Sequence, residues 1–185
     1  MPNNNLIITE AIKIVGLGGQ GVVTTAALLA RAAFHQGWWA QSMPFFGVER
    51  TGTPVEAYVR LARWPIHTHQ KIEHPNILLI NDYNLYNPKK LGRKLTIVSN
   101  SNLNEYHPKP QLLIYDSQQI SSFIFNKNLA VCLLGALSAC WPLIEEQHWR
   151  KAIEEQFINK EIVQKNWQAF IANKELATKL IQLHD

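Results

Sequence analysis

A dense run of glycines near the amino terminus constrains the fold of this chain more than any other feature. The run reads Gly16-Leu17-Gly18-Gly19-Gln20-Gly21, and it directly follows the short apolar segment Ala11–Val15. The next segment, Val22–Phe34, is rich in Ala and Leu. This order predicts a strand, a tight glycine turn and a helix.

The spacing of Gly16, Gly18 and Gly21 satisfies the G-x-G-x-x-G pattern in the position where it has structural meaning. Glycines there let the backbone turn sharply and approach a ligand closely. The free N–H groups at the start of the following helix attract an anion. The turn therefore predicts a phosphate as the natural ligand.

Three interpretations of this turn stay open. A dinucleotide site needs an acidic residue about 20 positions further on, at the end of the second strand. That region reads Trp38-Trp39-Ala40-Gln41-Ser42 and contains no acid, which argues against NAD or FAD. The other two interpretations are a purely structural turn and a site for a phosphate-bearing ligand that is not a dinucleotide.

Short apolar runs and longer amphipathic segments follow the turn and indicate the fold class. The runs predict strands over Trp38–Met43, Val55–Leu61, Asn76–Ile80, Leu95–Val98 and Leu112–Tyr115. Helical spacing marks Leu129–Ala139, Ile144–Phe157 and Lys160–Leu183. We expect one α/β domain over residues 1–185, a Rossmann-like or flavodoxin-like variant with three layers. Its sheet is mostly parallel and mixed, and a helical segment over about 144–185 completes it.

Composition and charge exclude several classes of protein. Apolar residues make up 46% of the chain and charged residues 17%, as in ordinary globular domains. The net charge of +4 is scattered without a run of five like charges, so we expect no nucleic-acid partner. No signal sequence and no apolar run of 18 residues are present, which predicts a cytoplasmic protein without a membrane partner.

The two cysteines and the other reactive side chains give no catalytic or metal site. Cys132 and Cys140 lie eight residues apart on one predicted helix, about 12 Å, too far for a disulfide. His67 and His69 lack a third ligand at suggestive spacing. The candidate nucleophiles Ser99, Ser101 and Ser117 have no nucleophile-elbow context, and we expect Trp141, Trp149 and Trp167 to be packing anchors or interface residues.

The connection Pro44–Pro54 is the most unusual stretch of the chain. It reads Pro44-Phe45-Phe46-Gly47-Val48-Glu49-Arg50-Thr51-Gly52-Thr53-Pro54. Apolar rings in a surface loop must cover either the domain's own core or a partner. Arg50 can grip a phosphate or carboxylate with two hydrogen bonds. The alternative is that Phe45 and Phe46 close the sheet edge while Glu49 and Arg50 form a weak surface ion pair.

Together, the glycine turn and this loop closely resemble the gamma subunit of pyruvate:ferredoxin oxidoreductases. That family shows a Gly-Gly-Gln-Gly turn and a Phe-Gly-x-Glu-Arg-x-Gly-Ala-Pro loop in the same order and spacing. The resemblance continues through Pro75–Leu78, Asn128–Leu129 and Leu133–Leu137, and so covers most of the chain. Departures such as Thr53 for Ala and Asn76 for Asp leave the glycines and the Glu49-Arg50 pair in place.

The resemblance implies a subunit that is not catalytic alone, in an enzyme that oxidises pyruvate to acetyl-coenzyme A and reduces ferredoxin, or runs in reverse. It places thiamine diphosphate, Mg and [4Fe–4S] clusters in partner subunits of the alpha, beta and delta types, and contact with ferredoxin is indirect. The residues it assigns to binding, with coenzyme A as the expected contact, are Gly18, Gly19, Gln20, Gly21, Phe46, Gly47, Glu49 and Arg50.

Two choices stay open after the resemblance. The Phe-Phe-Gly-Val-Glu-Arg loop is closer to the pyruvate type than to the 2-oxoglutarate type, which has Gly-Pro-Glu-Ala-Arg-Gly-Gly, but branched-chain 2-oxoacid enzymes carry similar loops. The other hypothesis is a stand-alone regulatory module that binds a phosphate or nucleotide.

Overall fold

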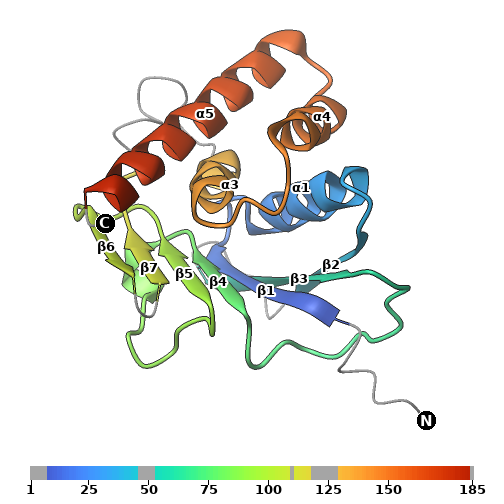
Figure 1. Cartoon of the computed structure of the whole chain (residues 1–185), viewed down its shortest axis with the longest axis horizontal. Coiled ribbons are helices and arrows are strands. Elements are labelled where there is room, and N and C mark those ends of the chain that lie inside the picture. The colour runs from blue at the N-terminus through green and yellow to red at the C-terminus, as the bar shows by residue number, and fades with distance from the viewer. Residues whose placement is uncertain (1–7, 46–52, 109–110, 118–128, 184–185) are drawn as a thin grey trace.

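The computed structural model describes residues 8–45, 53–108, 111–117 and 129–183, which form one sheet covered by helices (Figure 1). The strands are β1 (Ile8–Leu17), β2 (Trp39–Phe45), β3 (Pro54–Ala62), β4 (Ile77–Ile80), β5 (Leu95–Val98), β6 (Glu105–Pro108) and β7 (Gln111–Ile114). The helices are α1 (Val22–His35), α3 (Leu129–Cys140), α4 (Glu146–Gln156) and α5 (Lys160–Gln182), with a 3-10 turn η2 (Tyr83–Leu85). Every predicted strand and helix is present, whereas β6 and η2 were not predicted.

The sheet is mixed, with strand order β2-β3-β1-β4-β5-β7-β6. Its centre is parallel, because β4 pairs with β1 and β5, and β5 pairs with β7. Both ends are antiparallel, through β2/β3, β3/β1 and β6/β7. The α/β class and the mixed sheet are confirmed, and the parallel share is smaller than the sequence indicated. The reason is that β2–β3 and β6–β7 follow one another without the long crossover that parallel neighbours require.

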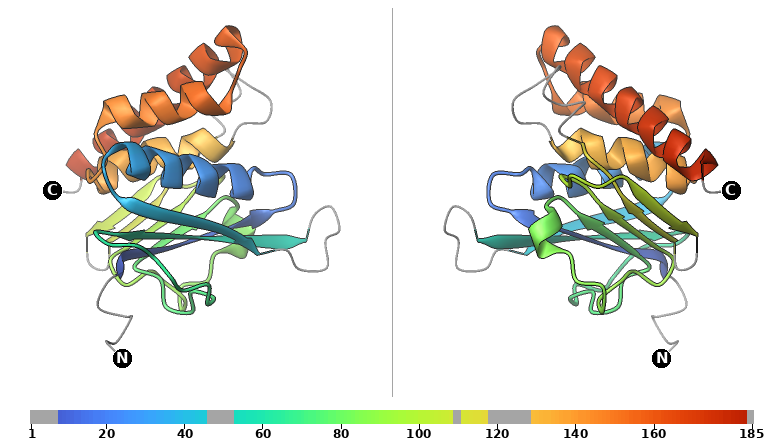
Figure 2. Two further views of the ribbon diagram at one scale, coloured as in Figure 1. Left: turned by 90° about the vertical axis from the view of Figure 1, so that its right-hand side faces the viewer. Right: turned by 90° about the vertical axis from the view of Figure 1, so that its left-hand side faces the viewer.

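All four described α-helices lie on one face of the sheet (Figure 2). α1 and α3 contact the strands, while α4 packs on α1 and α5 packs on α3. The three layers are therefore the sheet, an inner pair of helices and an outer pair. On the opposite face the chain between β3 and β5 runs across the sheet as loops and the short turn η2 (Figures 1 and 2).

The main core lies between the sheet and the helices. Strand alternation directs Ile12, Ile14 and Leu79 to this side, where all three are fully buried. α3 is buried nearly all round because it is enclosed between the sheet and α5. α3 and α5 approach closely at Gly135, where an added Cβ would lie 2.2 Å from the carbonyl oxygen of Phe170.

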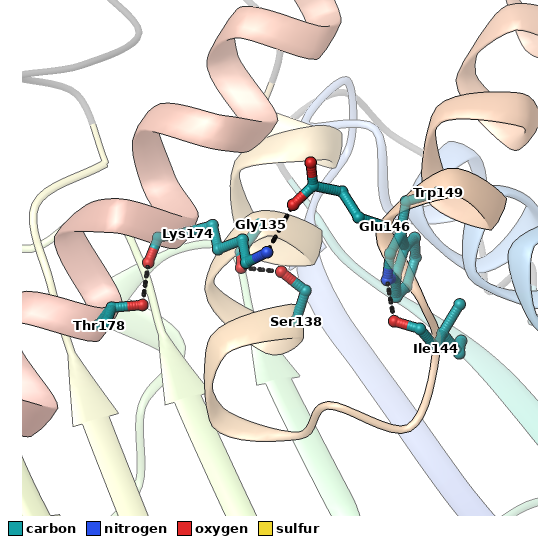
Figure 3. A network of polar contacts seen from close by, with 7 residues as sticks. All are labelled: Gly135, Ser138, Ile144, Glu146, Trp149, Lys174 and Thr178. Atoms are coloured by element: carbon teal, nitrogen blue, oxygen red, sulfur yellow. Dashed lines mark hydrogen bonds and ion pairs between the residues drawn. The ribbon is translucent and has the colours of Figure 1, made fainter.

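A polar contact joins the outer helices α4 and α5 to each other beside α3 (Figure 3). The indole Nε1 of buried Trp149 donates to the carbonyl of Ile144 at 3.2 Å, which anchors the start of α4. Lys174 of α5 forms an ion pair with Glu146 of α4 at 2.6 Å. Trp149 also packs against Phe170 with ring centroids 5.6 Å apart. The prediction that this tryptophan is a packing anchor is confirmed.

Both cysteines lie on α3 as free thiols, as the sequence predicted. Burial raises the pKa of the Cys132 thiol and that of the Cys140 thiol to about 12. Burial also raises the pKa of Tyr115, which is fully enclosed after β7. All three groups are therefore neutral in the folded chain at physiological pH.

Candidate anion-binding site

The glycine turn lies at the carboxyl end of β1, beside the carboxyl end of β4. From β1 the chain runs through α1 towards β2 and β3 on one side of the sheet, whereas β4 leads to β5 on the other side. The strand order thus changes direction between β1 and β4. In open α/β sheets such a switch point, outside the carboxyl ends of the strands, is where ligands bind.

Close packing and backbone conformation explain two of the glycines in the turn. A Cβ on Gly16 would lie 2.6 Å from Cγ2 of Val22 and 3.0 Å from Cβ of Asn81, so only glycine lets β1, α1 and β4 meet there. Gly21 precedes α1 with φ of 76°, in the left-handed region that glycine tolerates without strain. The predicted strand, turn and helix are confirmed at these positions.

Gln20 fastens the turn to the neighbouring strand. Its side-chain Oε1 accepts from the N–H of Leu17 at 2.7 Å, and its Nε2 donates to Oδ2 of Asp82 at 2.9 Å. Asn81 completes the link, since its Nδ2 donates to the carbonyl oxygen of Gln20 at 3.1 Å. Gln20 therefore acts through the shape of the turn, and its amide is occupied by the protein itself.

Backbone N–H groups at the start of α1 are the donors that the turn offers. The N–H groups of Val22, Val23 and Thr24 have no acceptor within the described ranges, as expected for the first turn of a helix. The start of α3 lies beside them, because a Cβ on Gly21 would lie 3.2 Å from Cβ of Ala130. Two helix amino termini, each a partial positive charge, thus meet at this edge.

Asn81 and Asp82 are site residues that the sequence analysis did not select. Asp82 is 5% exposed and holds η2 through Oδ1, which accepts from the N–H of Asn84 at 3.0 Å. The Oδ1 of fully buried Asn81 has no partner among the described residues. The available signal was their position directly after a buried strand, since polar residues there reach the carboxyl edge of the sheet.

The serines at the same edge are engaged in backbone structure. Ser99 Oγ donates to the carbonyl oxygen of Ile80 at 3.4 Å, and Ser117 Oγ accepts from the N–H of Asn100 at 3.2 Å. Ser101 Oγ accepts from the N–H of Leu103 at 3.0 Å. These contacts fix the strand ends, and they supply no base that would activate a hydroxyl as a nucleophile.

Four predicted site residues, Phe46, Gly47, Glu49 and Arg50, lie outside the described residues. The described end of their loop does reach the glycine turn, because the N–H of Gly18 donates to the carbonyl oxygen of Thr53 at 3.1 Å. Phe45, at the other end, is 48% exposed and meets Tyr58 edge to face at 6.3 Å. The two motifs that the sequence separates by more than 20 residues are therefore joined directly in the fold.

His67 and His69 lie in the exposed connection after β3. The Nδ1 of His69 lies 3.3 Å from Nε2 of Gln41, and His67 is exposed. Within residues 8–45, 53–108, 111–117 and 129–183, no three His, Cys, Asp or Glu side chains are placed to share a metal ion. Of the helices in those ranges, none combines the length and the apolar character needed to cross a bilayer.

Comparison with known proteins agrees with these features. A subunit named as the gamma subunit common to pyruvate and ketoisovalerate oxidoreductases in Pyrococcus furiosus is 33% identical over 170 residues, covering 85% of this chain and 91% of that subunit. The crystal structure of pyruvate oxidoreductase subunit PORC from Thermotoga maritima has the same fold. Its TM-score is 0.76 at 22% identity, over 91% of this chain and 96% of that one.

A longer chain contains the same fold as one part. The 2-oxoglutarate:ferredoxin oxidoreductase from Magnetococcus marinus, solved with 2-oxoglutarate, coenzyme A and succinyl-coenzyme A, matches with a TM-score of 0.73 at 18% identity. The match covers 92% of this chain and 31% of that one. The family model of pyruvate ferredoxin/flavodoxin oxidoreductases matches residues 11–175. This chain therefore belongs to the pyruvate ferredoxin/flavodoxin oxidoreductase family, as a subunit of the gamma type.

Proposed function

We propose that this gamma-type subunit holds the phosphates of coenzyme A at its glycine turn, in a complex that converts pyruvate and coenzyme A to acetyl-coenzyme A and CO2 and reduces ferredoxin, or catalyses the reverse. Thiamine diphosphate, Mg and [4Fe–4S] clusters supply the decarboxylation and electron-transfer chemistry when bound, and alpha-, beta- and delta-type partners would hold them.

One observation carries the assignment of the phosphate site. The N–H groups of Val22, Val23 and Thr24 point out of the first turn of α1, at an edge where α3 also begins. Backbone N–H groups at a helix start bind phosphate without any charged side chain. Asp82 lies nearby, but Gln20 and Asn84 occupy its two oxygens, so its charge is partly compensated.

The loop after β2 supplies the second half of the proposed site. Thr53 binds the glycine turn directly, so Arg50, three residues earlier in the chain, is within a short distance of it along the backbone. A guanidinium there would add a bidentate contact to phosphate that the turn itself lacks. We assign Phe46, Gly47, Glu49 and Arg50 to the coenzyme A site together with Gly18, Gly19, Gln20 and Gly21, and Gln20 and Gly18 act there through the shape of the turn.

The loop favours the pyruvate class, and the name of one relative bears on which subunit selects the 2-oxoacid. The Pyrococcus furiosus subunit is named as common to pyruvate and ketoisovalerate oxidoreductases, so one gamma subunit there accompanies two substrate specificities. We infer that the substrate is selected elsewhere in the complex. The gamma subunit then serves the step that all these enzymes share, which is transfer of the acyl group to coenzyme A.

A charge placed at the start of α1 tests the phosphate site without unfolding the helix. Val23 is 37% exposed in the first turn. Val23→Asp should stabilise the helix through its dipole and yet repel a bound phosphate. In the assembled enzyme we expect the KM for coenzyme A to rise about tenfold relative to Val23→Asn, with kcat at saturating coenzyme A preserved.

Arg50→Ala should raise the same KM, and a normal KM in both Val23→Asp and Arg50→Ala would refute the proposed site. Purification of the tagged chain from its own host tests the assembly. Copurifying thiamine- and cluster-containing subunits support the proposal, whereas a colourless chain that is active alone would support the stand-alone regulatory module.

A further inference from the structure

A cavity lined by several basic side chains lies on the face of the sheet that no described helix covers. It is a groove of about 630 Å³, bordered by the connections between β3 and β5. Its floor is formed by Val15, Leu78 and Ile80, the side chains that these strands direct away from the helices. The glycine turn opens α1 on the opposite face, so the groove is a separate site.

The charges of the groove are unequally compensated. Glu56 pairs with Lys13 at 2.7 Å and with Lys71 at 3.3 Å, and Glu73 also lines the groove, so these four side chains together carry no net charge. In contrast, Lys89, Lys90 and Arg93 have no acidic partner within the described residues. These three residues, called the basic wall below, leave an excess of positive charge facing an apolar floor.

Backbone hydrogen bonds hold the basic wall in place. The N–H of Lys89 donates to Oδ1 of Asn87 at 2.9 Å, and the N–H of Lys90 donates to the carbonyl oxygen of Asn87 at 2.9 Å. The N–H of Arg93 donates to the carbonyl oxygen of Pro75 at 3.0 Å. The side-chain charges therefore project from a fixed segment, which lowers the entropy lost when a ligand binds.

We propose that this groove binds a nucleotide, with its phosphates on the basic wall and its base on the apolar floor. A volume of about 630 Å³ lies in the range of sites for small organic ligands. Lysine and arginine are the side chains that bind phosphate most often, and a planar base can pack on aliphatic side chains such as Leu78 and Ile80. A lone phosphate would leave the floor exposed, so a ligand with both parts fits better.

Calorimetric titration of the full chain tests this site, with ATP, pyrophosphate and hexaglutamate as probes. We expect ATP to bind more tightly than pyrophosphate, and its affinity to fall with added salt. Lys89→Glu/Lys90→Glu should weaken ATP binding about tenfold or more. The matched control, Lys151→Glu/Lys160→Glu, makes the same change in net charge on exposed residues of α4 and α5, and it should leave the affinity within about twofold.

Several results would overturn the inference. Absence of ATP binding would do so, as would equal weakening by both double variants. Equal affinities for ATP and pyrophosphate would remove the role of the floor, and binding of hexaglutamate alone would identify a surface for an acidic peptide instead. The test is independent of the glycine turn, because Val23→Asp should bind ATP like the unmodified chain; loss of ATP binding there would move the nucleotide to the turn.

Discussion

The two faces of the sheet are built from the same strands but are covered in different ways. On the helix face, Ile12, Ile14 and Leu79 are fully buried beneath α1 and α3 in one large apolar cluster. On the loop face, the cluster around Leu78 and Ile80 is small and is bordered by ion pairs and a groove. Helices exclude water from a sheet, whereas loops leave room for polar groups and for ligands.

This difference separates stability from binding in the molecule. The side chains on the helix face are close-packed and supply most of the apolar burial. Both proposed binding sites lie away from this packing, one at the carboxyl edge and the other on the loop face. We therefore expect substitutions on the helix face to change folding, and substitutions at the other two places to change ligand binding.

The largest effect is expected where α3 meets α5. Gly135→Val would place side-chain atoms within the backbone of Phe170, so it should cost more than about 3 kcal/mol of unfolding free energy. Urea denaturation measures this value. Gly37→Ala is the control, because Gly37 has φ of 90° and an added Cβ would lie in open space, and it should cost only about 1 kcal/mol. Similar losses in both variants would contradict the close approach of the two helices.

Alanine substitutions at two consecutive leucines of β4 compare directly how much each face contributes to stability. Leu79 lies in the helix-face core and Leu78 lies on the floor of the groove. Leu79→Ala should cost about 3 kcal/mol, and Leu78→Ala about half of that, because water can enter the groove but not the core. Equal losses in urea unfolding would show that the loops exclude water as well as the helices do.

The fall in the free energy of unfolding at alkaline pH is expected to depend on two thiols buried on the helix face. The pKa values of Cys132 and Cys140 are raised by burial from 9.0 to about 12, so each group contributes stability that is present below pH 9 and is lost as the pH rises towards 12. The free energy of unfolding should fall over this range. Replacing both cysteines by Ala should make that fall shallower, and an unchanged slope would mean that the thiols ionise without unfolding the core.

The smallest effect on the free energy of unfolding should appear at acid pH, and it should come from Glu56 on the loop face. Burial tends to raise the pKa of Glu56, but hydrogen bonds from Lys13, Tyr58 and Lys71 outweigh it, and the net shift is downward. Glu56 therefore contributes stability above its ordinary pKa of 4.5, which is lost as the pH falls through its lowered value. Glu56→Gln should flatten the acid limb of stability against pH, whereas Glu175→Gln, on the exposed side of α5, should leave it unchanged.

Much of the fold could be predicted because its signals are local. The glycine turn after Ala11–Val15 and before Val22–Phe34 determines a strand, a turn and a helix through backbone sterics alone. The short strand β6 was missed because Glu105-Tyr106-His107-Pro108 buries only Tyr106, and a proline is tolerated there only since the strand lies at the sheet edge. The sequence also did not indicate that the helices share one face, which depends on contacts between distant segments.

The candidate site likewise has some parts that the sequence predicts and others that only the tertiary structure brings together. The amino-acid sequence by itself determined the family resemblance and the position of the N–H groups that we propose bind phosphate, because a glycine-rich turn before a helix is specified within a few residues. Only the tertiary structure brought Asn81, Asp82 and Ala130 to that turn and gathered the basic wall beside Leu78 and Ile80. These residues meet through strand pairing and helix packing. The periodicity of apolar residues along the chain does not indicate which distant segments become neighbours.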